Sequence, residues 1–354
     1  MAGPLNVWEY EQLAEERLDE GAFGYFAGGA GDEWTLRENL AAFRRWVLRP
    51  RMLVDVGAAK TDATVLGRSV TMPILVAPTA FHGVAHPDGE LATARAAAAV
   101  GTVMCLSSLA STTPAELAAG APKGRRWFQL YWSRDRGFTK DLLAAVVDAG
   151  FEALVLTVDL PGVGRRERDL RSGFEIPEGY ALPSLPSHPG GGYFHAALSE
   201  IVDATLTWAD LEWLRTNCSL PLLVKGVLTA EDATLACEHG AAGIVVSNHG
   251  GRQLDGVAAS LDALPEAVEA AAGRAEVLMD GGVRRGTDVV KALALGAKAV
   301  LVGRPVIWGL AVDGEAGVRR VLELLREEVL LALVLLGSRT PDEVTREHVS
   351  RATQ

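Results

Sequence analysis

The residues best suited to chemistry lie in one short stretch, where His249 is followed by two glycines and then by Arg252. A base that works near neutral pH is most readily a histidine, and a guanidinium binds a carboxylate through oriented hydrogen bonds. Asp159 could fix the tautomer of such a histidine and stabilise its protonated form. A lone histidine is more often a hydrogen-bonded structural residue, but the adjacent glycines and Arg252 favour a site for an anionic substrate. The stretch therefore predicts acid–base chemistry with His249 as the base.

Further cations follow other apolar or glycine-containing stretches. Lys225 comes directly after the apolar run 222–224, so its ammonium is expected inside a polar cavity. It would need an anionic partner there. Arg166 belongs to a basic patch with Arg168 and Arg171, and for these last two a solvated helix start is the preferred interpretation.

Glycines and arginines near the C-terminal end of the chain indicate a phosphate site. Gly281, Gly282 and Gly303 follow two apolar runs, where barrels of parallel strands commonly bind phosphate through backbone N–H groups. Arg284 and Arg304 could add charge-assisted hydrogen bonds. Taken alone, the glycines are equally consistent with tight turns that need their conformational freedom.

These residues need a scaffold that brings the ends of many apolar runs together. From about residue 73 onward, short β-branched or apolar runs alternate with Ala-, Leu- and Glu-rich stretches of helical length, which is typical of βα units. Eight such runs predict an α/β fold, a (β/α)8 TIM barrel, and no GxGxxG follows an early strand as in an open dinucleotide-binding sheet. The expected strands are 73–77, 102–106, 127–130, 153–157, 222–224, 243–246, 276–279 and 299–302.

The remaining segments fit one domain, 1–354, around this barrel. Residues 1–70 are expected to form an N-terminal helical cap, because charged and apolar residues from Trp8 to Leu18 recur at spacings of three to four. Residues 71–354 are expected to form the barrel. The long loop 172–198 after strand 4 is rich in proline and glycine, and it is a candidate lid.

Composition excludes several classes of protein. The chain of 354 residues is 49% hydrophobic and has a formal net charge of −11, which disfavours nucleic acid and anionic membranes as partners. Its three cysteines match neither a disulfide framework nor a metal motif, and with no secretory signal at the N-terminus they indicate the cytoplasm. The apolar run 329–336 is too short for a membrane helix and is expected to be a buried helix face.

Nine ordered motifs resemble those of the FMN-dependent 2-hydroxy-acid oxidase and dehydrogenase family, which includes glycolate oxidase, lactate oxidase, the flavin domain of flavocytochrome b2, mandelate dehydrogenase and 4-hydroxymandelate oxidase. The resemblance covers nearly the whole chain. The motifs are SNHGGRQLD from Ser247, YFAGGAGDEWTLREN from Tyr25, RPRMLVDV from Arg49, APTAFHGVAHPDGE from Ala77, FQLY from Phe128, LTVDLPGVGRRERDLR from Leu156, LVKGVLTAEDA from Leu223, DGGVRRGTDVVKALALGA from Asp280 and VGRP from Val302.

The resemblance implies FMN as cofactor, no metal, and a role for each matching residue. The implied catalytic residues are His249 as base, Asp159 hydrogen-bonded behind it, Tyr131 and Lys225. The implied substrate contacts are Tyr25, Tyr131, Arg166, Arg252 and Leu109. The implied FMN contacts are Thr79, Ala80, Ser107, Gln129, Thr157, Lys225, Ser247, Asp280, Gly281, Gly282, Arg284, Gly303 and Arg304.

The implied reaction is oxidation of an (S)-2-hydroxy acid to the 2-oxo acid, with O2 as the expected acceptor and H2O2 as product. The proton taken by His249 could come from C2 or from the hydroxyl group. Leu109 stands where glycolate oxidase has tryptophan, which predicts a substrate bulkier than glycolate, medium-chain or mandelate-like. A dehydrogenase that uses a quinone or protein acceptor, an FMN-dependent isomerase and a silent flavoprotein are the alternatives. Family members are commonly tetramers, so a homo-oligomer is expected by analogy.

Overall fold

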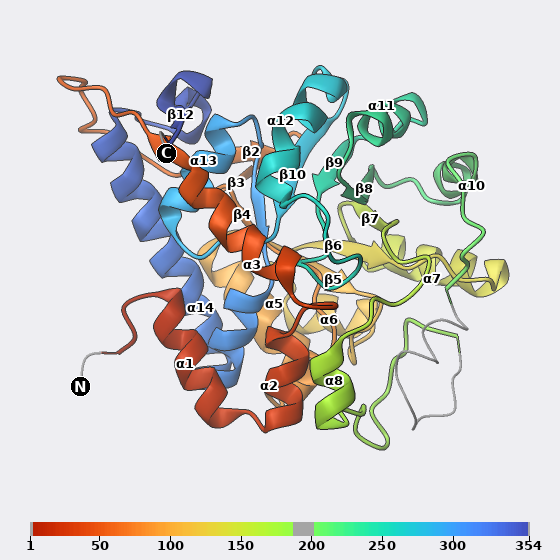
Figure 1. Cartoon of the computed structure of the whole chain (residues 1–354). Coiled ribbons are helices and arrows are strands. Elements are labelled where there is room, and N and C mark those ends of the chain that lie inside the picture. The colour runs from red at the N-terminus through yellow and green to blue at the C-terminus, as the bar shows by residue number, and fades with distance from the viewer. Residues whose placement is uncertain (1–2, 187–201, 353–354) are drawn as a thin grey trace.

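Eight short parallel strands pair in chain order and close into a barrel, as predicted (Figure 1). The computed structural model describes residues 3–186 and 202–352. Every strand is fully or mostly buried, because it faces the barrel interior on one side and helices on the other. The strands are β4 (Ile74–Val76), β5 (Val103–Ser107), β6 (Arg125–Leu130), β7 (Leu154–Thr157), β8 (Leu222–Val227), β9 (Gly243–Val246), β10 (Glu276–Asp280) and β11 (Val300–Val302).

Helices connect the strands and cover the outside of the barrel (Figure 1). Several begin at residues that satisfy their free N–H groups. Thr113 and Glu116 form a capping box at α6, and the Thr229 side chain accepts from the Asp232 N–H at α11. Within the described ranges, the helices after β4 are α4 (His82–Ala85), α5 (Gly89–Val100), α6 (Pro114–Gly120), α7 (Arg136–Asp148), α8 (Glu167–Ser172), α10 (Asp210–Asn217), α11 (Ala230–Glu238), α12 (Ser260–Ala271), α13 (Gly286–Ala294) and α14 (Arg304–Leu336).

The segment before the barrel is helical at first and then forms short strands. It contains α1 (Val7–Arg17), α2 (Glu20–Ala27), α3 (Trp34–Ala41) and the 3-10 turn η1 (Ala42–Arg45). Helix α1 packs on α14 and α2 packs on α8, so the helical part lies over elements that follow barrel strands. Strand β1 (Trp46–Leu48) pairs antiparallel with β12 (Val349–Arg351), which follows the 3-10 turns η2 (Pro341–Glu343) and η3 (Arg346–His348).

A hairpin closes the N-terminal end of the barrel, a feature that the helical interpretation of residues 1–70 missed. Strands β2 (Ala63–Val65) and β3 (Arg68–Val70) pair antiparallel, and their apolar side chains join the cluster that fills the barrel interior. The Leu66 N–H donates to the Glu276 carboxylate at the start of β10, at 2.9 Å. Because Glu276 is the first residue of β10, the hairpin lies at the N-terminal ends of the barrel strands. The polar residues of the predicted site lie at the opposite, C-terminal ends.

The apolar run 329–336 ends α14, which is kinked at Asp313 and Gly314. The expectation of a buried face holds for only part of the run. Val329 and Leu333 are buried, whereas Leu331 and Leu335 are 58% and 65% exposed. A helix with one apolar stripe toward the core leaves its other side to solvent or to a partner. None of the helices in the described ranges is long and apolar enough to cross a membrane.

The long loop after β7 lies only partly within the described residues. Residues 173–186 follow α8, and two of their aromatic side chains pack on residues of α2 and of the turn before α4. Phe174 stacks on Tyr25 with ring centroids 4.6 Å apart, and Tyr180 lies edge-on to Phe81 at 5.8 Å. The remainder of the candidate lid, from residue 187 on, lies outside the described residues.

Candidate active site

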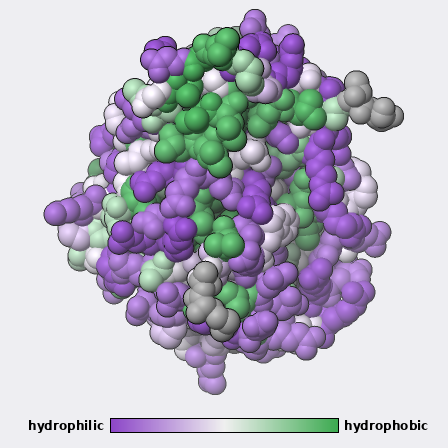
Figure 2. Space-filling model, turned by 90° about the vertical axis from the view of Figure 1, so that its left-hand side faces the viewer, coloured by the Kyte–Doolittle hydropathy of each residue, from purple (hydrophilic) through white to green (hydrophobic). Residues whose placement is uncertain are grey.

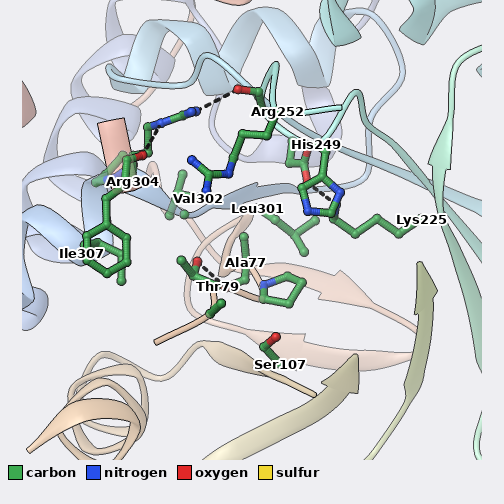
Figure 3. A pocket seen from close by; sticks show the side chains of 18 of the residues that line it. Ala77, Thr79, Ser107, Lys225, His249, Arg252, Leu301, Val302, Arg304 and Ile307 are labelled. Carbon is green, nitrogen blue, oxygen red and sulfur yellow. Dashed lines mark hydrogen bonds and ion pairs between the residues drawn. The ribbon is translucent and has the colours of Figure 1, made fainter. Parts of the chain in front are cut away.

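One cavity opens among the C-terminal ends of the barrel strands, and sixteen of the predicted site residues line it. Figure 3 shows Arg252 and His249 reaching into it from the loop after β9, with Lys225 and Arg304 on either side of them in this view. The strand ends thus converge as the βα pattern predicts. The predicted residues that line the cavity are Tyr25, Thr79, Ala80, Ser107, Leu109, Tyr131, Arg166, Lys225, His249, Arg252, Asp280, Gly281, Gly282, Arg284, Gly303 and Arg304.

Four other predicted site residues lie directly behind this lining. Gln129 is fully buried on β6, where its amide accepts from the Ser107 hydroxyl at 3.1 Å and donates to the Thr157 hydroxyl at 3.0 Å. The Ser247 hydroxyl accepts from the Lys225 ammonium at 3.1 Å. Asp159 lies behind His249. Gln129, Ser247 and Asp159 thus each contact a side chain that lines the cavity, and Thr157 contacts Gln129.

His249 and Asp159 form a partly buried pair. The His249 Nδ1 lies 2.9 Å from the Asp159 Oδ1, and the His249 N–H donates to the Ser247 hydroxyl at 3.0 Å. Burial lowers the pKa of His249 below 6.5, although the Asp159 carboxylate opposes this. Burial also acts to raise the pKa of Asp159, but the neighbouring His249 outweighs it and the pKa is lowered. Near neutral pH the pair is therefore a neutral imidazole backed by a carboxylate, as a general base requires.

The loop that carries His249 has a special backbone. His249, Gly250 and Gly251 have φ of 60°, 64° and 77°, a left-handed conformation that histidine rarely adopts. A Cβ atom on Gly251 would lie 2.6 Å from the Leu36 nitrogen, so only glycine lets α3 pack against this loop. Strained residues of this kind cluster at functional sites, which agrees with the role predicted for His249.

Two guanidinium groups face the same part of the cavity. Arg166 and Arg252 lie over the Tyr25 ring, with their Cζ atoms 5.9 Å and 4.6 Å from its centroid. The Arg252 Nη1 donates to the carbonyl oxygens of Tyr25 and Gly28. Burial and the nearby Arg252 charge lower the pKa of Arg166 to about 10. A buried cation, Arg166, beside a partly buried one, Arg252, favours an anion between them, and a carboxylate fits the planar forks of both.

Lys225 is buried at the end of β8 between two polar groups. Its ammonium lies 3.1 Å from the Ser247 hydroxyl and 3.3 Å from the Asp280 carboxylate. Burial acts to lower its pKa, but the Asp280 and Asp159 carboxylates outweigh this, and the pKa of Lys225 is raised. The side chain is therefore a fixed positive charge at the wall of the cavity.

The opposite part of the cavity is suited to a phosphate. Gly303 stands at the N-terminus of α14, where free N–H groups and the helix dipole attract anions. The buried Arg284 Nε has no hydrogen-bond partner among the described residues, and its nearest carboxylate, on Glu11, is 3.9 Å away. Arg304 donates to the carbonyl oxygens of Phe26, Gly28 and Gly250, which fixes its guanidinium in the cavity wall.

The structure explains residues of the SNHGGRQLD stretch to which sequence reasoning assigned no role. Asn248 and Asn39 exchange two side-chain hydrogen bonds of 2.8 Å, which tie the loop to α3. Asp255 accepts from the N–H groups of Trp34 and Thr35 and so caps the same helix. The Gln253 amide donates to the carbonyl oxygen of Asp159 at 2.7 Å. These partners are all more than 90 residues apart, and only a signal for long-range contacts could have paired them.

Comparison with known proteins agrees with this geometry. The family model described as FMN-dependent dehydrogenase matches residues 14–351. The chain belongs to that family. It is 52% identical to an L-lactate oxidase from Nostoc over 95% of both chains. It is also 51% identical to glycolate oxidase 3 from Arabidopsis thaliana, over 97% of this chain and 95% of that one.

Solved structures of the family superimpose on nearly the whole chain. A mandelate oxidase variant with (S)-mandelic acid aligns with a TM-score of 0.91 at 42% identity and covers 99% of both chains. A structure of (S)-mandelate dehydrogenase aligns with a TM-score of 0.92 at 38% identity, over 98% of this chain and 99% of that one. The barrel is thus the fold of FMN-dependent 2-hydroxy-acid oxidases and dehydrogenases, and FMN is the cofactor of this family.

The charges of the cavity fit FMN together with an anionic substrate. Five cations line it, Arg166, Lys225, Arg252, Arg284 and Arg304, whereas Asp280 is the carboxylate among its lining residues. A phosphate monoester carries about two negative charges, and a carboxylate adds one. Burial lowers the pKa of Arg304 well below its usual value, and Arg252 and Arg284 lower it further. Such a surplus of buried and partly buried cations is costly unless anions bind.

Proposed function

We propose that this protein oxidises an (S)-2-hydroxy acid to the 2-oxo acid, with His249 as base and O2 as the final electron acceptor. The observation that carries the proposal is His249, which has Asp159 at 2.9 Å behind it and lines the same cavity as Arg166 and Arg252. FMN, when bound, supplies the two-electron acceptor for this chemistry. The roles given below to individual residues belong to the proposal.

Each side chain has a physical role in this reaction. Arg166 and Arg252 bind the substrate carboxylate, which places C2 and its hydroxyl near the imidazole. His249 takes a proton that the substrate releases on oxidation, and Asp159 stabilises the resulting imidazolium. Tyr131 has a raised pKa because of burial and the nearby Asp159 charge, so it stays a neutral hydrogen-bond donor. Lys225 stabilises negative charge that develops beside it.

Leu109 supports a substrate bulkier than glycolate, medium-chain or mandelate-like. Its side chain is buried and lines the cavity on the β5 side. A leucine there leaves more room than the tryptophan of glycolate oxidases. Mandelate oxidase bound to (S)-mandelic acid is among the structurally similar proteins, which also favours a bulky acid.

We further propose that residues 173–186 belong to a lid over this cavity. The support is Phe174, which stacks on one side of Tyr25 while the Arg252 guanidinium lies over the same ring. Loss of this contact in Phe174→Ala is expected to raise KM by a few-fold more than it lowers kcat, because Tyr25 is held less firmly. An unchanged KM would speak against the lid.

The surface supports assembly into a homo-oligomer, a tetramer by analogy with the family. Figure 2 shows an apolar area in the upper half of the face that carries α14. On the described surface, Leu53 and Leu335 are 106% and 65% exposed, and the Arg51 N–H donates to the Leu336 carbonyl, which joins their two segments. Light scattering should show a multiple of 37.5 kDa, and Leu53→Asp should reduce it.

The proposal also includes O2 as the electron acceptor and the cytoplasm as the compartment. All three cysteines lie within the described residues and are free, which suits a reducing compartment such as the cytoplasm. Oxygen as acceptor is supported by the oxidases among the relatives, such as the L-lactate oxidase from Nostoc. A dehydrogenase with a quinone or protein acceptor would have the same cavity.

One experiment separates these activities. The FMN-loaded protein is mixed anaerobically with glycolate, (S)-lactate, (S)-mandelate and a medium-chain 2-hydroxy acid, and the flavin absorbance is followed. We expect bleaching by the bulkier acids, and then peroxide when O2 is admitted. Bleaching with slow reoxidation by O2 but fast reoxidation by a quinone would identify a dehydrogenase. No bleaching by any acid would reject the proposed reaction and favour the isomerase alternative.

A further inference from the structure

Gly226 forms a bulge at the end of β8, immediately after Lys225. Lys225 pairs with Val245 and Val227 pairs with Val246 on β9, so Gly226 is an extra residue in the strand. Its φ is +117°, in the region that favours glycine. Bulges beside active sites commonly redirect a side chain, and this one lies at the barrel mouth.

The space above Gly226 is filled by Asp159. A Cβ atom on residue 226 would lie 2.7 Å from the Asp159 Cβ, 2.8 Å from its Cγ and 2.9 Å from its backbone nitrogen. Distances this short are far inside van der Waals contact between carbon atoms. Because a backbone nitrogen is among these atoms, rotation of the Asp159 side chain could not relieve the overlap.

Asp159 is held from its other sides as well. Its carboxylate binds the His249 ring at 2.9 Å, and its carbonyl oxygen accepts from the Gln253 amide at 2.7 Å. The preceding residue, Val158, donates its N–H to the Lys225 carbonyl oxygen at 2.9 Å. A side chain at position 226 would therefore move the carboxylate relative to the imidazole.

We propose that the absence of a side chain at Gly226 positions Asp159 against His249, which makes Gly226 a positioning residue for proton transfer. The inference rests on the proposed function of His249 as base. Asp159 follows β7 and His249 follows β9, and the proposal adds that residue 226 of β8 must be a glycine for the two side chains to meet.

Gly226→Ala is the direct test. The anaerobic rate constant of flavin reduction is expected to fall roughly 10- to 100-fold, the usual cost of misplacing a reacting group. Asp159 raises the pKa of His249 against the effect of burial, so a displaced Asp159 should move the acid limb of the pH profile to lower pH. The other groups that face His249 around the cavity, Lys225, Arg166, Arg252 and Tyr131, are retained in the variant.

Two controls separate positioning from general damage. Gly150 has φ of +71° and nothing within 4 Å of an added Cβ, so Gly150→Ala also places an alanine at positive φ, but far from Asp159. It should keep the wild-type rate and pH profile. The affinity of Gly226→Ala for FMN should stay within about twofold of wild type, because Lys225 keeps its place.

A double-mutant cycle tests whether Gly226→Ala acts through Asp159. Asp159→Gly removes two of the three atoms that an added Cβ would meet, so adding Gly226→Ala to it should change the rate less than about twofold. If Gly226→Ala alone lowers Tm too far for assay, Asp159→Gly should restore part of the lost Tm in the double variant, because it removes the Asp159 Cβ and Cγ. The proposal is overturned if the two substitutions act independently on rate and on Tm, or if FMN affinity falls in step with the rate. Wild-type flavin reduction in the same assay checks the proposed function separately.

Discussion

The two ends of the barrel are built by the same strands but differ in chemistry. Side chains two positions apart on a strand point to the same side of the barrel wall. Of two such inward-facing residues, the one nearer the hairpin is apolar and the one nearer the mouth is polar, as in Val155 and Thr157 on β7 or Leu223 and Lys225 on β8. Two further pairs of this kind are Cys105 and Ser107, and Leu278 and Asp280. On each of these strands, a residue that packs in the core is thus only two positions from a residue of the candidate active site. This agrees with the general division of such barrels into a stabilising N-terminal end and a catalytic C-terminal end.

The largest effect is expected at the mouth. His249→Gln should lower the rate of flavin reduction by about 10²- to 10⁴-fold, because the variant lacks the general base. FMN binding and Tm should stay close to wild type, since the side chain is replaced by a polar one of similar reach. Stopped-flow absorbance measures the rate, and retained turnover would reject His249 as base.

A substitution near the hairpin end of the barrel should lower stability and leave the rate of flavin reduction unchanged. Leu278 is fully buried in the interior cluster, so Leu278→Ala should lower the free energy of unfolding by about 2–5 kcal/mol. The rate of flavin reduction at 25 °C should remain near that of wild type. Denaturant unfolding measures the first quantity. A large loss of rate in folded Leu278→Ala would break the distinction between the two ends.

A smaller effect is expected on the preference for mandelate over glycolate when Leu109 is replaced. Leu109→Trp fills space at the cavity wall, so it should lower kcat/KM for mandelate relative to glycolate by roughly tenfold or more. Steady-state kinetics with both acids measures the ratio. An equal loss on both substrates would mean that residue 109 does not select substrate size.

The smallest effect is a pH dependence of the wild-type enzyme. His249 must be neutral to accept a proton, and burial lowers its pKa below 6.5 in spite of Asp159. Flavin reduction at low substrate concentration should therefore fall as the pH drops through a value below 6.5, and stay level from there to about pH 8. An acid limb centred above pH 6.5 would contradict a buried, neutral imidazole.

The sequence predicts the regular part of this molecule well. Alternating apolar runs predict all eight strands, because each strand is buried on both sides and its burial is visible locally as an apolar run. Polar residues at the ends of these runs predict most of the cavity lining, since parallel strands bring their C-terminal ends together.

Features that depend on long-range packing could not be predicted in this way. The β2–β3 hairpin has ordinary polar and apolar residues, and only its position under the barrel gives them a role. Gln129, Thr157 and Ser247 follow the same local pattern as the lining residues, yet they do not line the cavity, and their side chains are hydrogen-bonded to neighbouring polar side chains instead. Leu331 and Leu335 look like core residues in the sequence but lie on the outer side of α14.

The central claim is that His249, Arg166 and Arg252 act on one substrate beside one flavin. A crystal structure of the FMN-bound protein with a 2-oxo acid tests it most directly. The account predicts the carboxylate within about 3 Å of both guanidinium groups, and the oxygen on C2 at a similar distance from the His249 ring. A carboxylate bound elsewhere, or an FMN phosphate away from Arg284 and the α14 N-terminus, would contradict it.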